Sequence, residues 1–565
     1  MDFKYQLALS LQTATNLPLE DILSAIEVPK DTANGDFAFP CFKLAKELKK
    51  APPVIAKELA DQLTGQIACV TQIEQAGAYL NFTLDKTVFA KVVMEALYQK
   101  GESFGSDTLG QGKTVVIDYS SPNIAKPFHV GHLRSTMIGN ALYNIHNFLG
   151  YTTVGVNHLG DWGTQFGKLI VAYKNWSSEA AVREGKIAEL NRIYVKFHDE
   201  AKTQPELEDE GRAWMLKMQE GDKEALDIWT FFRDMSLEEF EVMYTRLGVT
   251  FDHYTGESFY NDKMDAPLAE LAEKGLLVES DGAKIVMLDE FDLAPCLLLR
   301  KDGGTLYHTR DLAAAFYRKH TFDFHKALYV TALDQSLHFT QLFKVIGKMG
   351  HDWANNMAHV PFGLVSLEDG KLSTRSGRVV LMQDLLDEAE AHALSIINEK
   401  NPELPNKDQV AKDVGIGAIV FNDLYNTRIK DVVFSLSKML NFDGETGPMV
   451  QYTHVRTCSL LEKGSAIDFG QVDYALLTDD ASNEVLTHLY FYPETIKTAA
   501  EKNEPYLIAR QLVAISQSFN RFYHHNPILS SDDATKNARL ALVHHVGAVL
   551  RSGLKLLGVN APAHM

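Results

Sequence analysis

The chain has 565 residues, of which 45% are apolar and 23% are charged. At about 150 residues per domain this length predicts three or four folded units with the composition of an ordinary globular protein. The net charge of −19 excludes a general nucleic-acid coat, because phosphate binding needs clustered Lys and Arg, but it still permits a local basic patch that binds a specific RNA.

The cysteines and the start of the chain indicate a reducing compartment. Cys41, Cys69, Cys296 and Cys458 lie too far apart for a zinc site or a disulfide scaffold. The N-terminal residues lack the basic start and apolar core of a signal peptide, and no stretch of about 18 apolar residues predicts a membrane span. We therefore expect a cytoplasmic protein without a membrane partner.

Residues 1–110 are expected to form a small α/β domain. A helical start is followed by a turn at NGD, a helix, a break at Pro52 and Pro53, and another helix. The alternation in CVTQIEQAGAYLNFTL predicts a pair of strands.

A second unit begins at Thr114. TVVIDYS is a short β-branched run that ends in a Ser-Ser-Pro-Asn loop, and a helical pattern follows from about His132. Strand, loop and helix in this order open a nucleotide-binding α/β half. YTTVGVN, ALYVTAL and VPFGLVSL are further predicted strands, so we expect a Rossmann-like nucleotide-binding domain with a parallel sheet over residues 111–385. A mostly helical, charged insertion is predicted at about 172–300.

The rest of the chain is expected to be helical. Residues 386–444 are predicted to form a helical region that connects the Rossmann-like domain to an all-α bundle at 445–565. VQYTHVRTCSLLEKG, IARQLVAISQSFNRFYHH and NARLALVHHVGAVLRSGLKLLG each carry an apolar stripe at helical spacing.

The strongest motif is SPNIAKPFHVGHLRST at residues 121–136. His129 and His132 flank Gly131 between a predicted strand and a predicted helix. Neutral imidazoles donate hydrogen bonds to phosphate oxygens, a helix N-terminus adds N–H groups, and glycine permits a close approach of the nucleotide. On its own the pattern is weak, because a histidine pair can also simply cap a helix.

A second motif is the polar loop GKLSTRSGR at residues 370–378, which carries Lys371, Arg375 and Arg378. Basic loops bind polyphosphates and stabilise the charge that develops when a bond to phosphorus breaks. A lone loop of this kind is more often a solvated surface loop, so the functional interpretation depends on the two motifs occurring together and in this order.

Together the two motifs resemble the ATP loops of class I aminoacyl-tRNA synthetases, since HVGH is similar to the HIGH signature and KLSTR to the KMSKS loop. NHLGDWGTQFG, YHTRDLAAA and VQYTHVRT resemble the arginyl-tRNA synthetases in particular. GDFAFPCFKLAK and GAYLNF resemble the N-terminal domain of that family, and LRSGLKLLGVNAPAHM its anticodon-binding end. The resemblance spans nearly the whole chain. It implies that ATP, arginine and tRNA(Arg) are the substrates, with an arginyl-adenylate as intermediate and AMP and pyrophosphate as products.

The resemblance also implies how ATP is held. His129, Gly131 and His132 are expected to bind the nucleotide, while Lys371 and Ser373 belong to the loop that closes over its phosphates. Mg²⁺ accompanies the nucleotide, and no metal site built from protein side chains is expected.

The second loop departs from the family signature at Thr374, where the family has a second Lys. A cation that normally meets the phosphates is therefore missing. We hypothesise that Lys126 supplies it as a catalytic residue, with Arg375 as the competing candidate.

Selection of arginine requires carboxylates that face a planar guanidinium. The resemblance assigns this role to Glu257 in YTGES and Asp311 in YHTRD. It also implies that Tyr307 and Gln335 line the pocket and that Asn123 binds the α-amino group. Further family-like residues are expected near the active site, either in contact with substrate or supporting those that are: His158, Gly160, Asp161 and Gln165.

Recognition of tRNA is expected to divide between two domains. The terminal bundle resembles a domain in which unstacked bases meet aromatic and Arg side chains. The N-terminal domain resembles the one that touches the outer corner of the folded tRNA, and Asn81 and Phe82 lie in its GAYLNF segment. The family generally binds tRNA before it activates arginine, so little ATP–pyrophosphate exchange is expected without tRNA. The candidates in the bundle are Tyr452, His454, Arg456, Phe519 and Tyr523.

Two alternatives stay open at this point. Glutamyl, cysteinyl and leucyl enzymes share the two ATP loops, although a glutamate pocket should carry Arg or Lys where Asp311 and Glu257 stand. A non-enzymatic relative that binds tRNA would explain Thr374, but the retained histidines and Lys371 argue against it. A monomer is the default expectation.

Overall fold

The computed structural model describes residues 2–29, 31–367 and 380–565. The described chain forms two compact units. Unit 1 comprises Met1–Phe104, Thr457–Phe491 and Gln517–Val549, and unit 2 comprises Gly105–Arg456, Tyr492–Ser516 and Leu550–Met565. Among the described residues, no helix has the length and apolar character needed to traverse a lipid bilayer.

The N-terminal part of unit 1 is an antiparallel sheet with helices. The strand order is β1-β3-β2, so the predicted pair β2–β3 is confirmed and β1 is an addition that the sequence pattern did not predict. β1 has four residues and ends at Pro40, which lacks an N–H and suits an edge strand. The elements are α1 (Phe3–Thr15), α2 (Leu19–Ala25), β1 (Phe37–Pro40), α3 (Phe42–Leu48), α4 (Pro52–Leu63), β2 (Val70–Ala76), β3 (Tyr79–Leu84) and α5 (Lys86–Lys100).

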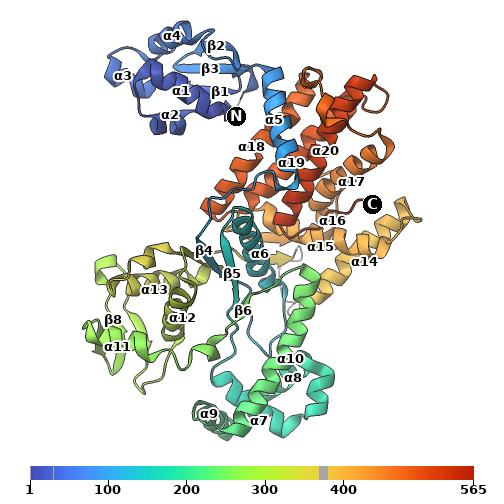
Figure 1. Cartoon of the computed structure of the whole chain (residues 1–565). Coiled ribbons are helices and arrows are strands. Elements are labelled where there is room, and N and C mark those ends of the chain that lie inside the picture. Colours follow the sequence, from blue (N-terminus) through green and yellow to red (C-terminus); the bar gives the residue numbers. More distant parts are fainter. Residues whose placement is uncertain (1, 30, 368–379) are drawn as a thin grey trace. The chain divides into compact units, whose positions relative to one another are not determined.

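Unit 2 contains a five-stranded, fully parallel sheet of order β11-β10-β4-β5-β6. The β-branched run at 114 forms its central strand, and α6 (Leu133–Phe148) follows that strand and packs beside it (Figure 1). Strand order runs outward from β4 on both sides, which puts the topological switch between β4 and β10. The predicted Rossmann-like fold is confirmed. The strands are β4 (Thr114–Asp118), β5 (Thr152–Asn157), β6 (His253–Tyr254), β10 (Lys326–Tyr329) and β11 (Met357–His359).

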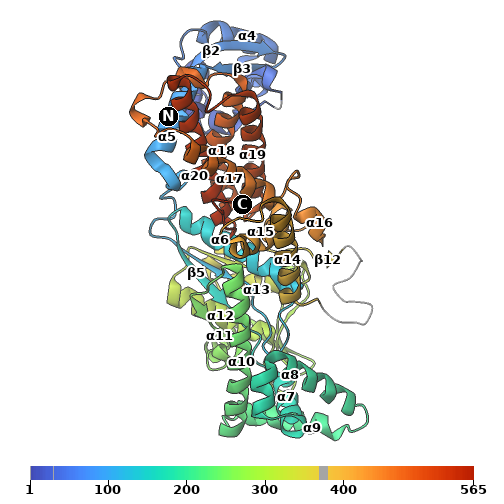
Figure 2. The same cartoon turned by 90° about the vertical axis from the view of Figure 1, so that its right-hand side faces the viewer.

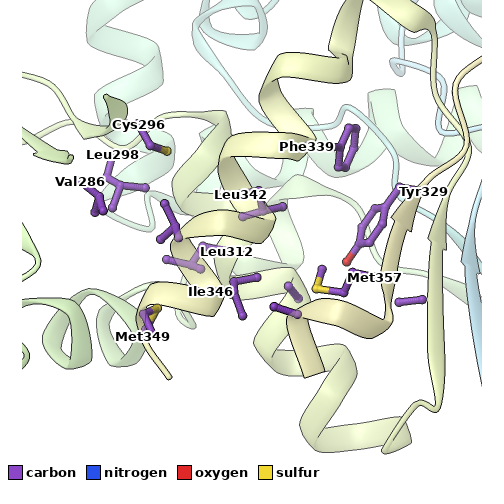
Figure 3. Close-up of a cluster of buried hydrophobic side chains, with 14 of the residues drawn as sticks. Val286, Cys296, Leu298, Leu312, Tyr329, Phe339, Leu342, Ile346, Met349 and Met357 are labelled. Atoms are coloured by element: carbon purple, nitrogen blue, oxygen red, sulfur yellow. The ribbon is translucent and has the colours of Figure 1, made fainter. Parts of the chain in front are cut away.

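Two helices are anchored on this sheet by a buried apolar cluster. Leu312 of α12 (Tyr307–Phe322) meets Leu342 and Ile346 of α13 (Ser336–Lys348), and Tyr329 of β10 closes one side (Figure 3). All four side chains are at most 3% exposed. The cluster therefore fixes the first turns of α12 and α13 beside the sheet.

The insertion is mostly helical up to residue 273, interrupted by strand β6 of the parallel sheet, and then forms a small antiparallel sheet that was not predicted. Helices α7 to α10 lie side by side in both views (Figures 1 and 2). The turn between the first two strands is Asp281-Gly282, with φ of 50° and 83°. Positive φ at both positions is typical of a type I′ hairpin, and Asp-Gly was its sequence signal. The elements are α7 (Thr164–Trp176), α8 (Glu179–Glu200), α9 (Glu206–Gln219), α10 (Lys223–Leu247), α11 (Asp265–Glu273), β7 (Leu277–Ser280), β8 (Ala283–Val286) and β9 (Cys296–Leu299).

From Met382 onward the described chain is helical, as predicted, except for strand β13 (Val432–Phe434), which lies within the predicted helical connection. Of the predicted strand VPFGLVSL only Val365–Leu367 is a strand, because the N–H of Gly363 turns to the carbonyl of Arg428 and the chain then pairs with β13. The elements are β12 (Val365–Leu367), α14 (Met382–Lys400), α15 (Lys407–Tyr425), β13 (Val432–Phe434), α16 (Leu436–Met439), α17 (Gly447–Lys463), α18 (Asp480–Lys502), α19 (Tyr506–His525) and α20 (Asp533–Leu556).

Candidate active site

The candidate site lies at the carboxyl edge of the parallel sheet, where α/β proteins bind ligands at the switch point. The loop after β4 has three residues other than glycine with positive φ: Ser120 at 67°, Ser121 at 48° and Ala125 at 58°. Hydrogen bonds hold this backbone, since the amide of Ser120 donates to Ser135 Oγ at 2.9 Å and that of Ala125 to Ser236 Oγ at 2.9 Å. Backbone strain that is held in place in this way is typical of functional sites.

His129 and His132 form a reciprocal cap where this loop enters a short 3₁₀ turn, Val130–His132. The N–H of Gly131 donates to His129 Nδ1 at 3.1 Å, and the N–H of His129 donates to His132 Nδ1 at 3.1 Å. A Cβ at position 131 would come within 2.8 Å of the His129 ring, so only glycine fits. Because both Nδ1 atoms accept, each neutral ring carries its proton on Nε2.

Both rings are held in the neutral form. Burial, followed by the neighbouring His129, lowers the pKa of His132 to about 3. Burial and the charge of Lys126 also lower the pKa of His129. Near neutral pH the pair therefore offers two uncharged Nε2–H donors, and the exposed Lys126 is the nearby cation.

The chain on either side of residues 368–379 contacts the histidine loop or the helix that follows it. On the C-terminal side, the N–H of Val130 donates to the carbonyl of Val380 at 3.2 Å, and the N–H of Met382 donates to that of Phe128 at 3.0 Å. On the N-terminal side, Arg134 Nη1, on α6, donates to the carbonyl of Gly363 at 3.0 Å. The predicted residues Lys371, Ser373, Thr374, Arg375 and Arg378 themselves lie outside the described residues.

Glu257 is a buried carboxylate that is only weakly paired with a cation. It is 9% exposed, and its Oε2 has no hydrogen-bond partner among the described residues. Arg310 Nη1 is 4.0 Å from that oxygen, at the outer limit of an ion pair. Burial is the main cause that raises the pKa of Glu257 to about 8; the charge of Arg310 opposes the shift, and the charges of Asp311 and Asp161 add to it. Such a site favours a ligand that brings a positive charge.

Asp161, in the loop after β5, lies beside the segment that carries Glu257. Its carboxylate accepts the N–H of Ser258 at 2.8 Å and the Ser258 hydroxyl at 2.7 Å. Burial raises the pKa of Asp161 even though these bonds oppose the shift.

The other predicted pocket residues lie on neighbouring elements. Tyr307 and Asp311 are one turn apart on α12 and so share a face; Tyr307 is 66% exposed and the Asp311 side chain 22%. Gln335 is exposed at the start of α13. Asn123 is exposed too, and its backbone bridges to Gly160, where a Cβ would come within 1.9 Å of Asn123 Oδ1.

Two buried ion pairs support the site and were not predicted. Arg318 Nη2 lies 2.8 Å from Asp118 Oδ2 at the end of β4, and Arg134 Nε lies 2.8 Å from Asp423 Oδ1. Both guanidinium side chains are 1% exposed. The only sequence signal was that Asp118 ends a predicted strand and Arg134 follows the histidine motif.

The predicted tRNA contacts fall into exposed and buried groups. Tyr452 is 43% exposed with the guanidinium of Arg456 5.1 Å from its ring centre, and Tyr523 is 38% exposed. Asn81 is 7% exposed on β3. Three further candidates are also buried: Phe82, His454 and Phe519.

Comparisons with known proteins cover the whole chain. The family described as "Arginyl tRNA synthetase N terminal domain" matches residues 2–84, "tRNA synthetases class I (R), catalytic domain" matches 92–436, and "DALR anticodon binding domain" matches 450–565. An arginine–tRNA ligase of Alkaliphilus metalliredigens is 52% identical over 100% of both chains.

Solved structures show the same fold. The arginyl-tRNA synthetase of Thermus thermophilus superposes with a TM-score of 0.83 at 24% identity, covering 100% of this chain and 99% of that one. The arginyl-tRNA synthetase of Plasmodium falciparum gives a TM-score of 0.82 at 25% identity, covering 100% and 98%.

Proposed function

Because the chain belongs to the arginyl-tRNA synthetase family and is therefore an arginine–tRNA ligase, we propose that the carboxyl edge of its parallel sheet activates arginine with ATP. The carboxylate of arginine attacks the α-phosphorus, the bond to pyrophosphate breaks, and an arginyl-adenylate forms. The 2′-hydroxyl of the terminal ribose of tRNA(Arg) then attacks the carbonyl carbon, and AMP leaves. Neither step needs a protein nucleophile, so the side chains position substrates and stabilise phosphate charge.

The observation that carries this proposal is the pair of neutral imidazoles of His129 and His132. Once both Nδ1 atoms are engaged, the two Nε2–H groups remain as donors. Donors beside the N-terminus of a helix match a phosphate on which negative charge is growing. We assign ATP binding to these rings together with Gly131, whose lack of a side chain leaves the backbone open to the nucleotide.

Lys371 and Ser373 are proposed to close over the phosphates. The contacts of Val380 with the histidine loop and of Gly363 with Arg134 on the following helix support this assignment, because they bring the chain on both sides of residues 368–379 to the histidine motif. Mg²⁺ enters as part of the nucleotide substrate, bound mainly by phosphate oxygens and water.

Lys126 is proposed to supply the cation that the second loop lacks at Thr374. Lys126→Ala is expected to slow adenylate formation about tenfold, as loss of one charged donor to a phosphate does, while the KM for arginine stays unchanged. Single-turnover formation of the adenylate with tRNA bound measures the effect. Lys223→Ala, another exposed lysine of unit 2, is the control. Unchanged turnover in Lys126→Ala would transfer the role to Arg375.

Arginine is proposed to bind with its guanidinium against Glu257 and Asp311. A buried carboxylate with an unused oxygen supports this, because a guanidinium brings both the charge and the donors that the oxygen needs. Tyr307 and Gln335 line the entrance, and Asn123 takes the α-amino group.

The purified enzyme is expected to charge bulk tRNA with arginine and with none of the other nineteen amino acids. Citrulline, a neutral isostere of arginine, should not inhibit charging at concentrations at which arginine itself saturates the enzyme. Its urea group carries no charge and would leave the two carboxylates without a cation. Charging is measured as acid-precipitable aminoacyl-tRNA. Efficient inhibition by citrulline would mean that the carboxylates do not select the charge.

Recognition of tRNA(Arg) is proposed to divide between two surfaces. Tyr452, Arg456 and Tyr523 would stack on or bond to anticodon bases, since exposed aromatic and Arg side chains bind unpaired bases. Asn81 would contribute through the N-terminal domain, with Phe82 supporting its strand from the core.

We further propose a monomer that works in the cytoplasm. The corresponding domain assignment is tRNA binding at 1–110, catalysis at 111–385 with the insertion at about 172–300, a helical connection at 386–444 and anticodon binding at 445–565.

A further inference from the structure

The carboxylate of Asp311 lies between two imidazoles from different parts of the fold. His338, on the first turn of α13, places Nε2 2.6 Å from Oδ2. His158, in the loop after β5, places Nε2 3.6 Å from Oδ1. The side chain of His338 is 20% exposed, that of His158 13% and that of Asp311 22%, so all three lie mostly within the protein.

The chemistry of the carboxylate determines which group donates in the hydrogen bond between His338 Nε2 and Asp311 Oδ2. An ionised carboxylate can only accept hydrogen bonds, so Nε2 of His338 carries the proton. Burial acts to raise the pKa of Asp311, but the hydrogen bond from His338 and the charges of both histidines and Arg318 outweigh it and lower the pKa. The acceptor is therefore charged, and hydrogen bonds to charged groups are the stronger kind.

The ring of His338 is itself fixed. Its centre lies 4.0 Å from that of His308 with 34° between the ring planes, and Phe339 packs edge-on at 5.2 Å. The apolar cluster under α12 and α13 holds both helices, through Leu312 and Leu342 (Figure 3). A donor that cannot swing away defines the plane of the carboxylate it binds.

We propose that His338 is a positioning residue of the arginine pocket: it bonds to Oδ2 and fixes the plane in which the Asp311 carboxylate meets the guanidinium of arginine. Each carboxylate oxygen accepts two hydrogen bonds, so Oδ1 and the second lone pair of Oδ2 stay open to the substrate. A bidentate contact depends on coplanar groups and is lost when the carboxylate rotates. This inference rests on the proposed role of Asp311.

A matched pair of variants separates this role from packing. His338→Leu fills a similar volume but has no donor, whereas the amide of His338→Gln can reach the position of Nε2. The leucine variant is expected to raise the KM for arginine on the order of tenfold, with kcat and the KM for ATP unchanged, and the glutamine variant to stay close to the parent enzyme. Thr340→Ala, an exposed change on the same helix, is the control.

Other results would test the role of His338 and the role of Asp311 separately. Equal effects of leucine and glutamine, or no effect of leucine, would overturn the proposal. If the leucine variant does not fold, His338→Asn replaces it, because its amide is too short to reach Asp311. In an Asp311→Asn background His338→Leu should add nothing. An unchanged arginine KM in Asp311→Asn alone would refute the role of Asp311, independently of His338.

Discussion

Replacing His132 with asparagine is expected to slow adenylate formation by about 10²–10³-fold, because the phosphate loses one preorganised donor. The Oδ1 of asparagine can occupy the place of Nδ1 and accept the N–H of His129, so the loop keeps its cap and only the outer Nε2–H is lost. His132→Gln, whose amide extends further, should recover part of the rate. The rate is measured as arginine-dependent ATP–pyrophosphate exchange with tRNA(Arg) present.

The pH profile tests whether His132 acts as a neutral donor. Burial and the neighbouring His129 lower its pKa to about 3, so the ring does not titrate between about pH 5 and 8. His132→Asn should therefore reduce the rate by the same factor at both ends of that range. A factor that changes toward acid pH would show that the ring becomes charged there. His320→Asn, an exposed histidine of α12, is the control and should leave the rate unchanged.

The sequence predicts the strands that carry their own pattern and misses those that depend on their neighbours. The β-branched runs of β4 and β5 stand out, because each is a five- or six-residue run with turn residues behind it. β6 is only His253–Tyr254, too short for any periodicity, and it exists because β5 offers it a partner. β7 and β8 were missed although Asp281-Gly282 signalled their turn.

The site divides in the same way. Residues in contiguous motifs, such as His129, His132 and Asp311, can be singled out from the sequence. The pairs Arg318–Asp118 and Arg134–Asp423 could not, because their members come from distant segments and a lone charged residue is most often exposed. His338 was overlooked for a related reason: its function depends on where the ring lies relative to Asp311, which no spacing shows.

Replacing Glu257 with glutamine is expected to weaken arginine binding on the order of 100-fold, since it removes one charge from a desolvated pair and leaves the guanidinium facing an amide. Glutamine has nearly the same shape, so the loss reports charge and acceptor capacity rather than a cavity. The dissociation constant is measured by titration of the enzyme–tRNA complex with arginine. An affinity within about threefold of the parent would remove Glu257 from the pocket.

The pH dependence of this binding has a defined sign. Burial is the main reason that the pKa of Glu257 is raised to about 8 in the arginine-free protein. Below that pH arginine must displace a proton, so its affinity should rise with pH by up to about tenfold per unit and level off above pH 8. Glutamine should abolish the slope. Asp311→Asn should weaken binding and keep a slope that levels off at a lower pH, because the ionised Asp311 does not itself titrate in this range but its charge helps to raise the pKa of Glu257.

Glu257 should also make the folding stability of the arginine-free protein depend on pH. This stability should fall as pH rises, whereas the affinity for arginine rises. An unfolded Glu titrates at about 4.3, so between that pH and about 8 the folded, arginine-free protein holds a proton that the unfolded chain has released. The free energy of unfolding of the arginine-free protein therefore falls as pH rises through this window. Glu257→Gln has no such proton to lose, and its Tm relative to the parent should be higher at pH 8 than at pH 5. If Glu257→Gln is more stable without substrate and binds arginine poorly, then the burial of Glu257 is tolerated because arginine neutralises its charge. Equal Tm differences at the two pH values would contradict this.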